Sequence, residues 1–549
     1  MSQILILLFF YFLILYSILG YGRIFTLINN NYQASSFDGL LGIGLLILIS
    51  YTSNIFFPHN YLHNSIIILI GLIIFSYDFK KNYSKRKFDY RDLTIIFLLI
   101  FVGILLYKNH DDFYYYHFPY TLILTNFEKI FGLGNLNHAF RTPSSIFYLN
   151  SLFYLPGIKY FLMNGGAIYI LGFSNYIIYK NIKDLIKSKK FNHILFLSLL
   201  SLVYINTSFA RISEHGTDRS ALILIFIMSI YFLKSLDIKQ SQIRNDYFNN
   251  YFPKLAILFT IIITLKVFYL IYSIIFLLWF FQIKKFISLN SLVNLTLSNY
   301  YSYIVVVSFL FCIFTIFSNS GCLIYPASFT CFENFSWSVP ALEAKQMHLW
   351  FEQWSKAGAG PNFRIDNPEI YVSKFNWVEN WMSAYFFNKV SDNILVIVLI
   401  SIFLYFLFSY KLPKIYKQDI TKPNYKFFYF LVLILFFELF YNHPSLRYGG
   451  YTLLALIFFI PVSIFLSKFR YNSSNIKKKV YFLLILTSII FICRNLVRID
   501  KEFENYGYNP IKNAFFYLNK DGFIINDGVN EKYKNWKLKN KSFLTIERK

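Results

Sequence analysis

The sequence predicts an all-α polytopic membrane protein with about 13–14 transmembrane helices. Hydrophobic residues make up 56% of its 549 residues and charged residues only 15%, and its mean hydropathy is +0.46. A soluble domain of this size cannot hide so large an apolar fraction, and apolar runs of near-spanning length recur along the chain. The lipid bilayer is therefore the first expected partner.

The apolar runs give the expected spans in chain order. They lie at 4–20, 39–57, 64–78, 92–107, 160–179, 192–209, 219–234, 255–281, 300–318, 393–410, 427–441, 449–467 and 480–494. The first run lacks a positive n-region and a small-residue cleavage site, which favours a retained span over a signal peptide. The run 255–281 is too long for one simple helix and carries Lys266 near its middle. It predicts two short helices that turn at Lys266.

Positive charge predicts which connections face the cytoplasm. Lysine and arginine gather in 80–91, 180–190, 234–254, 284–285, 411–426 and 468–479. Counting spans between them places the remaining connections outside: 108–159, 210–218, the turn at Lys266, 319–392, 442–448 and the end of the chain. The expected organisation is a multi-spanning domain at 1–494, with outer loops 108–159 and 319–392, and an extracytoplasmic polar tail at 495–549.

Several classes of function are excluded. The net charge of +25 does not indicate a nucleic-acid partner, because the basic residues fall mainly in short loops between apolar runs. The chain has no Walker-type glycine loop, G-x-S-x-G, H-E-x-x-H or paired C-x-x-C motif, which argues against ATP hydrolysis and zinc protease chemistry. Cys322 and Cys331 share one loop, and they can form a disulfide if that loop is extracytoplasmic.

The first outer loop carries the strongest candidate site. Asp111 and Asp112 follow a span directly, and His110 and His117 flank them in the stretch HDDFYYYHFPYTLIL. Adjacent carboxylates beside lipid are costly and usually mark function. They are candidates for a base that deprotonates an acceptor hydroxyl, or for ligands of Mg²⁺ or Mn²⁺. The alternative is structural: the two acids cap an interfacial helix within 118–132 and pair with Lys108 or Arg141.

Other outer segments supply candidate phosphate ligands. RISEHGTDRS holds Arg211, Glu214, His215, Asp218 and Arg219, and YNHPSLRYGGY holds His443 and Arg447. His110, His117 and Arg141 of the first outer loop are further candidates for binding the substrate or its phosphate. Guanidinium groups offer paired donors to phosphate, whereas the structural alternatives are a solvated turn and a snorkelling arginine. Lys266 is a further phosphate candidate at the mouth of the site, or a snorkelling side chain.

The large loop 319–392 is rich in tryptophan and is punctuated by glycine and proline. A helix is expected near 340–356. Its tryptophans are candidates for stacking on sugar rings or for an aromatic belt at the membrane interface; they are Trp337, Trp350, Trp354, Trp377 and Trp381.

An acidic pair just after a span, an interfacial helix and many further spans resemble the GT-C superfamily of polyprenyl-phosphate-dependent membrane glycosyltransferases. The stretches HDDFYYYHFPYTLIL and SGCLIYPASFTCF, with the later WSVP, are similar to a poorly characterised bacterial branch of that fold. In one departure, about three spans precede the acidic loop here, whereas in the superfamily the loop follows the first span.

The resemblance implies a multi-pass protein of the bacterial inner (cytoplasmic) membrane whose active face is extracytoplasmic. It implies transfer of a sugar from a polyprenyl-phosphate carrier to a glycan, lipid or protein acceptor in cell-envelope synthesis, with Asp111 or Asp112 as the base. The alternative is a transporter or flippase, or a polymerase or ligase, for lipid-linked saccharide. A glycosyltransferase predicts one outward-facing cavity with the acidic pair and an arginine, and a transporter predicts a pathway across the bilayer.

Overall fold

The structure is a computed structural model, and it describes residues 2–24, 36–107, 110, 112–236, 251–284, 288–360, 365–409, 425–469 and 471–515. Over these residues the chain is helical, and its β pairings are two isolated bridges, Leu155 with Lys159 and Cys322 with Cys331. The helices of the first half are α1 (Gln3–Gly22), α3 (Asp38–Phe56), α4 (Tyr61–Ile100), η1 (Phe101–Ile104), η2 (Phe113–His117), α5 (Phe118–Asn126), α6 (Ser145–Ser151), α7 (Gly166–Lys187), α8 (His193–Ser208), α9 (Ile212–His215), α10 (Thr217–Ser235) and α12 (Phe252–Leu265). The second half contributes η7 (Val267–Tyr272), α13 (Ser273–Lys284), α14 (Leu289–Leu297), α15 (Tyr300–Ser320), α16 (Ala341–Lys356), α17 (Pro368–Val372), α18 (Val378–Trp381), η9 (Met382–Val390), α19 (Ser391–Ser409), α20 (Tyr425–Asn442), η10 (Leu446–Tyr448), α21 (Gly450–Leu466), α22 (Ser473–Tyr506) and α23 (Pro510–Asn513).

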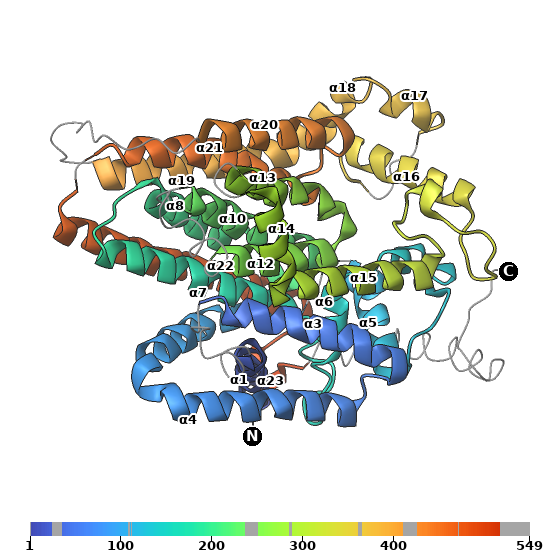
Figure 1. Cartoon of the computed structure of the whole chain (residues 1–549), viewed down its shortest axis with the longest axis horizontal. Helices are drawn as coiled ribbons and strands as arrows, with labels where there is room; N and C mark the ends of the chain where they lie inside the picture. The colour runs from blue at the N-terminus through green and yellow to red at the C-terminus, as the bar shows by residue number, and fades with distance from the viewer. Residues whose placement is uncertain are drawn as a thin grey trace.

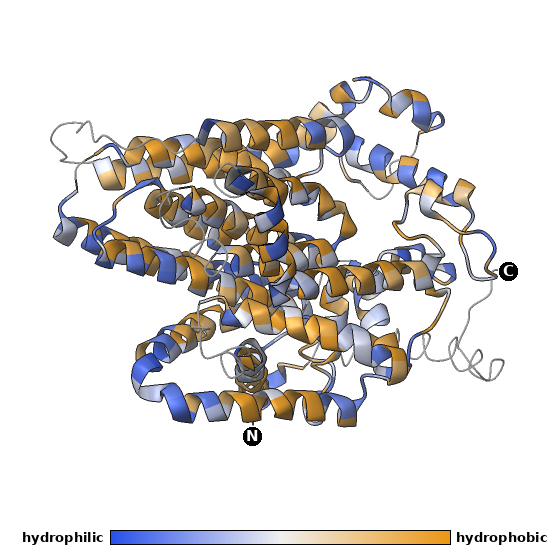
Figure 2. Cartoon of the chain, in the orientation of Figure 1, coloured by the Kyte–Doolittle hydropathy of each residue, from blue (hydrophilic) through white to orange (hydrophobic). Residues whose placement is uncertain are grey.

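The expected membrane class is confirmed. Within the described part of the chain, seven helical stretches are long and apolar enough to cross a membrane: α1, α3, α4 with η1, α15, α18 to α19, α20 and α22. Four shorter apolar helical stretches accompany them: α8, α12, η7 with α13, and α21. Apolar residues run along most of these helices, and hydrophilic ones concentrate at the bend of α4 and on α16 and α17 (Figure 2). The chain is thus an all-α multi-pass membrane protein.

Two predicted spans, 64–78 and 92–107, lie largely in the single helix α4. The helix bends back on itself (Figure 1), so both arms contact the same residue of α1. The Tyr16 ring stacks on Phe75 at 4.8 Å, and its hydroxyl lies 3.1 Å from Thr94 Oγ1. The predicted loop at 80–91 is wrong because that stretch has no glycine or proline to end the helix.

The predicted turn at Lys266 is confirmed. α12 ends at Leu265, Lys266 has extended backbone angles (φ −164°, ψ 125°), and η7 begins at Val267. The predicted helix near 340–356 is confirmed by α16.

The expected interfacial helix within 118–132 is wrong. Every residue of α5 from Phe118 to Thr125 is buried, so the helix presents no polar face to water. The Thr121 hydroxyl donates to the backbone carbonyl of His117 at 2.8 Å, which lets a polar residue face the core.

The final long helix crosses the boundary predicted at 494/495. α22 continues to Tyr506, and Arg498 pairs with Glu502 at 3.1 Å on its last turns. Most of the predicted polar tail, 516–549, lies outside the described residues.

The bundle has two distinct ends. In Figure 1, α5, α6 and α16 to α18 gather at the right, whereas the bend of α4 lies at the left. α10 and α12 connect these ends as an antiparallel pair. Lys266 after α12 contacts Asp218 at the start of α10 at 3.0 Å, and Lys254 at the start of α12 lies 5.8 Å from the Tyr231 ring late in α10.

Candidate functional site

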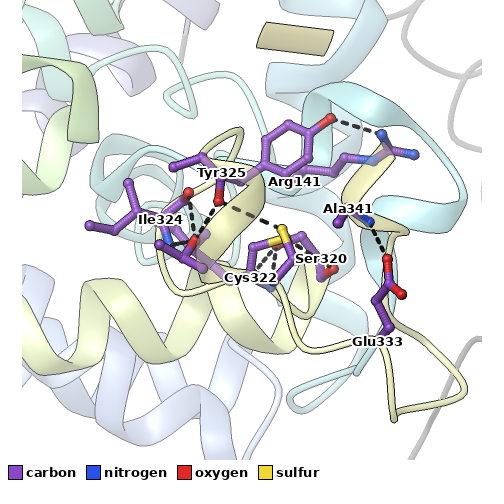
Figure 3. Close-up of a disulfide and its surroundings, with 11 residues drawn as sticks. Arg141, Ser320, Cys322, Ile324, Tyr325, Glu333 and Ala341 are labelled. Atoms are coloured by element: carbon purple, nitrogen blue, oxygen red, sulfur yellow. Dashed lines mark hydrogen bonds between the residues drawn. A yellow bond between two sulfur atoms is a disulfide. The ribbon is translucent and has the colours of Figure 1, made fainter. Parts of the chain in front are cut away.

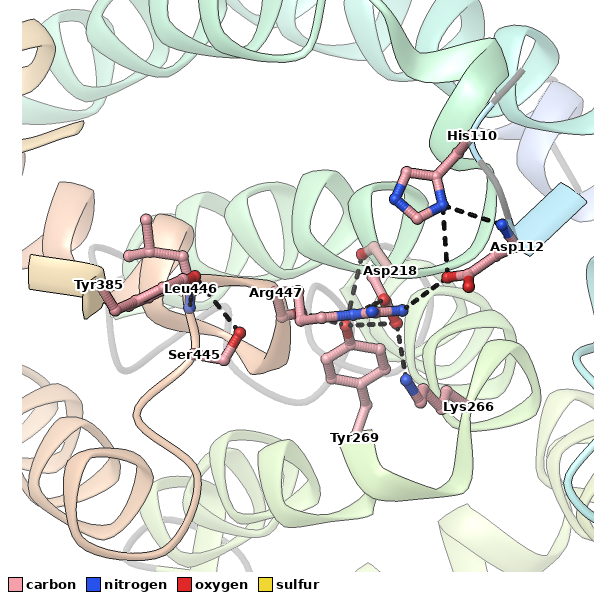
Figure 4. Close-up of polar contacts among 9 residues, drawn as sticks. All are labelled: His110, Asp112, Asp218, Lys266, Tyr269, Tyr385, Ser445, Leu446 and Arg447. Atoms are coloured by element: carbon pink, nitrogen blue, oxygen red, sulfur yellow. Dashed lines mark hydrogen bonds and ion pairs between the residues drawn. The ribbon is translucent and has the colours of Figure 1, made fainter. Parts of the chain in front are cut away.

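A charged cluster at the start of α10 joins three of the predicted outer segments (Figure 4). The buried carboxylate of Asp218 receives Lys266 Nζ at 3.0 Å and Arg447 Nε at 2.8 Å, one cation on each oxygen. The Tyr269 hydroxyl lies 3.3 Å from the same carboxylate and 2.9 Å from the Arg447 carbonyl, to which it donates. Asp218 therefore fixes the positions of both cations.

Local sequence places each of these groups. Asp218 sits in the first turn of α10, where the helix dipole favours an anion. Lys266 breaks the apolar run between α12 and η7. Arg447 belongs to η10, which ends at Gly449 with φ 141°, and a Cβ at that position would collide with the Tyr272 hydroxyl. Only glycine fits this turn, so the turn holds Arg447 in place.

Arg447 also reaches the first outer loop. Its Nη2 lies 3.5 Å from Asp112 Oδ2, and His110 Nδ1 accepts the backbone N–H of Asp112 at 3.1 Å. The Asp112 side chain makes no capping hydrogen bond to the helix that follows. The Asp112 side chain is 29% exposed and that of Asp218 is 8% exposed, so Asp112 is the carboxylate open to a substrate.

Aromatic rings border the two cations. The Arg447 guanidinium lies 5.3 Å from the Trp354 ring centre, and Lys266 Nζ lies 4.9 Å from that of Tyr448. The His443 ring packs against Tyr448 at 5.4 Å. The rings desolvate one side of each cation and add cation–π attraction, while both cations remain about 30% exposed, 30% for Arg447 and 27% for Lys266.

Burial and charge set the protonation states. Burial acts to raise the pKa of Asp218, but Lys266 and Arg447 outweigh it and hold that pKa well below its usual range. Burial lowers the pKa of His117 to about 4 and the pKa of His443 to about 4. Both imidazoles are therefore neutral near pH 7 and do not add positive charge to the cluster.

Four predicted site residues thus come into direct contact: His110, Asp112, Lys266 and Arg447 are linked through ion pairs and hydrogen bonds that include Asp218. Asp111 and the side chain of His215 lie outside the described residues. The predicted arginines of the second cluster have other contacts. Arg211 pairs with Glu214 at 2.6 Å, and Arg219 packs over the Phe209 ring at 5.8 Å.

Arg141 contacts a different set of residues. It pairs with Glu343 of α16 at 2.5 Å. It also donates to the Tyr325 hydroxyl at 2.9 Å (Figure 3). The same loop carries the Cys322–Cys331 disulfide, which confirms the pairing considered from the sequence. Arg141 therefore ties the first outer loop to the large one, and it does not pair with Asp112 as the structural alternative expected.

The described residues do not supply a set of ligands for Mg²⁺ or Mn²⁺. They contain no group of three or more His, Cys, Asp or Glu side chains that could hold a metal. Both oxygens of Asp218 are taken by cations, which leaves Asp112 alone as an open carboxylate. Asp111, the other predicted ligand, lies outside the described residues.

Sequence reasoning did not include Asp218 and Tyr269 among the site residues. Asp218 stood among four other ionisable residues in RISEHGTDRS, and Tyr269 stood in an apolar run with many aromatics. The usable signal was position, because Asp218 is the acid that directly precedes the predicted span 219–234. Trp354 was one of five tryptophans, and only its contact with Arg447 distinguishes it.

The fold and the cluster define an all-α multi-pass membrane protein with a charged site at one end of its bundle. The family described as "Domain of unknown function (DUF8201)" matches residues 4–454, and the chain belongs to this family. No curated protein and no solved structure matches the chain.

Proposed function

We propose that the chain is a glycosyltransferase that moves a sugar from a polyprenyl-phosphate carrier to an acceptor hydroxyl. The observation that carries the proposal is the contact between a partly exposed carboxylate and one of two partly exposed cations that share a buried counter-ion. Asp112 lies 3.5 Å from Arg447, and Arg447 shares Asp218 with Lys266. A base next to an anion site is what transfer from a phosphate leaving group requires.

The reaction is a displacement with inversion at the anomeric carbon. The acceptor oxygen bonds to that carbon while the bond to the carrier phosphate breaks. Asp112 takes the acceptor proton, and the phosphate leaves with the bonding electron pair, stabilised by Arg447 and Lys266. Binding of the carrier phosphate to Arg447 also draws that cation from Asp112, which frees the carboxylate to take the acceptor proton.

Asp218 acts as a positioning residue in this scheme. It is buried and carries both cations, so it fixes the separation of the guanidinium and the ammonium before the carrier binds. Groups held in place in advance avoid reorganisation during the reaction. Trp354, against the guanidinium, offers an aromatic face for a sugar ring.

The proposed location is a bacterial inner membrane with the site on the extracytoplasmic face. The distribution of lysine and arginine supports this orientation, because the loops that it predicts to be outside lie together at one end of the bundle. The Cys322–Cys331 disulfide supports it too, since disulfides persist in oxidising compartments. The proposal covers envelope glycans and glycolipids as a class, without naming the sugar or the acceptor.

The test is turnover of radiolabelled polyprenyl-phosphate sugars by purified protein in lipid nanodiscs. Asp112→Asn should lower transfer by about 10²–10⁴-fold, the usual loss for a general base. An Asp111→Asn/Asp112→Asn double variant excludes replacement by the neighbouring acid. Asp366→Asn, an exposed acid of the large outer loop, is the matched control and should keep full activity.

Full transfer by a folded double variant would refute the role of the acidic pair. Turnover of no carrier by the folded wild-type protein would favour the alternative of a transporter or flippase. Assembly of lipid-linked saccharide by the double variant would instead indicate a polymerase or ligase.

A further inference from the structure

A second charged site lies at the opposite end of the bundle. A cavity of about 270 Å³ opens there between α1, α3, α4, α7, α10 and α12. Its walls carry five cations and three carboxylates. The cations are Arg23, Arg86, Lys180, Lys234 and Lys254, and the carboxylates are Asp38, Asp89 and Asp184.

The ion pairs of this cavity leave two lysines without a carboxylate partner. Arg23 pairs with Asp38 at 3.2 Å and with the buried Asp78 of α4, and Lys180 pairs with Asp89 at 2.6 Å. Lys234 and Lys254 have no carboxylate within 4.0 Å among the described residues. These two lysines therefore hold positive charge that an incoming anion can neutralise.

Asp184 attracts both lysines and Asp38 attracts Lys254, but only from beyond ion-pair distance, and their close contacts are with neutral groups. Lys234 donates to the Asn181 side-chain oxygen at 2.8 Å. Lys254 Nζ lies 5.8 Å from the Tyr231 ring and 5.9 Å from the Phe37 ring. Aromatic rings on one side of an ammonium limit its hydration, which strengthens its attraction to an anion on the open side.

The same two helices connect this cavity to the candidate site. Sixteen residues of α10 separate Asp218 from Lys234, which is about 24 Å at the helical rise. Twelve residues of α12 separate Lys254 from Lys266, about 18 Å. The hydrocarbon core of a bilayer is about 30 Å thick, so the two sites fit near opposite membrane surfaces when the helices tilt or end within the interface.

We propose that the cavity between α10, α12 and α4 binds a phosphate-bearing anion at the membrane surface opposite the candidate site. Two sources share this chemistry: the phosphodiester head group of an anionic membrane lipid and a free phosphate compound. Basic pockets between membrane helices on the cytoplasmic side commonly hold lipid head groups. The cavity of about 270 Å³ is slightly smaller than the roughly 300–1,000 Å³ of pockets that bury drug-sized ligands, which suits a phosphate or a small head group.

The test measures ligand binding by native mass spectrometry on wild-type protein in nanodiscs. One arm compares phosphatidylcholine discs with discs that contain phosphatidylglycerol, and the other adds inorganic phosphate to phosphatidylcholine discs. Lys234→Gln/Lys254→Gln should weaken binding at least tenfold in one arm. Lys187→Gln/Lys189→Gln, which removes two exposed lysines near the end of α7, is the matched control and should leave binding unchanged.

A gain-of-binding variant keeps the test decisive if the double variant does not fold. Asp184 lines the cavity and is exposed, so Asp184→Asn should fold and should tighten binding about three- to tenfold by removing a like charge. Retention of phosphatidylglycerol alone assigns a lipid head group, and binding of inorganic phosphate alone assigns a free solute. Equal binding by the wild type, the lysine variant and Asp184→Asn in both arms would overturn the proposal.

Discussion

Replacing Asp218 by asparagine is the most direct test of the candidate site's architecture. The change removes the one anion that pairs with Lys266 at 3.0 Å and with Arg447 Nε at 2.8 Å. Breaking a buried pair by removing one partner costs about 3–5 kcal/mol. Both cations are about 30% exposed, so solvent screens part of the loss, and we expect about 2–3 kcal/mol.

The assay is the free energy of unfolding in mixed detergent micelles. Asp218→Asn should be strongly destabilised, whereas Glu379→Gln, an exposed acid with no ion pair among the described residues, should change the free energy by less than about 0.5 kcal/mol. Adding Arg447→Gln to Asp218→Asn should recover part of the loss, because the double variant no longer holds the Arg447 guanidinium without its Asp218 counter-ion.

Two results would refute this reasoning. Asp218→Asn could prove as stable as Glu379→Gln, which would mean that the cations lie in a wetter environment than the structure shows. Alternatively, the losses of Asp218→Asn and Arg447→Gln could add without coupling, which would mean that the two side chains do not interact.

Three further predictions concern acidity, the disulfide and the aromatic wall. His117 and His443 have a pKa of about 4 in the folded state, below the unfolded value of about 6.5, so unfolding takes up protons as pH falls. The stabilisation from each neutral imidazole is fully present above pH 6.5 and is lost as pH falls toward 4, so that the free energy of unfolding drops by about 2 kcal/mol per histidine at pH 5. A free energy of unfolding that stays constant over this window would contradict the prediction. Replacing Cys322 and Cys331 by serine opens a loop with a sequence separation of 9 and should lower the free energy of unfolding by about 3 kcal/mol. Wild-type protein reduced with dithiothreitol should show the same loss as the serine variant. Trp354→Ala should lower kcat/KM for carrier by about 5- to 30-fold while Trp354→Phe retains most of it, and equal losses would argue against ring stacking.

The membrane class and much of the helix pattern were predictable from the amino-acid sequence. Apolar runs of spanning length have no other solvent than lipid, so composition decides that question without tertiary information. The turn at Lys266 was predictable too, because a charged residue inside a long apolar run needs a polar partner or an exit from the helix. The bend within α4 was not predictable, since a charged stretch without glycine or proline can remain helical while it bends.

Which charges meet was decided only by the tertiary structure. Asp112, Asp218, Lys266 and Arg447 come from four separate segments, and local patterns carry no record of which loops lie side by side. Arg141 and Arg447 are equally good phosphate candidates in the sequence, yet Arg141 pairs with Glu343 and Arg447 pairs with Asp218. Burial also separates the roles of the two acids. Asp218 is buried and serves as a fixed counter-ion, whereas Asp112 remains partly exposed, because only the packing of the helices determines which carboxylate is accessible to solvent.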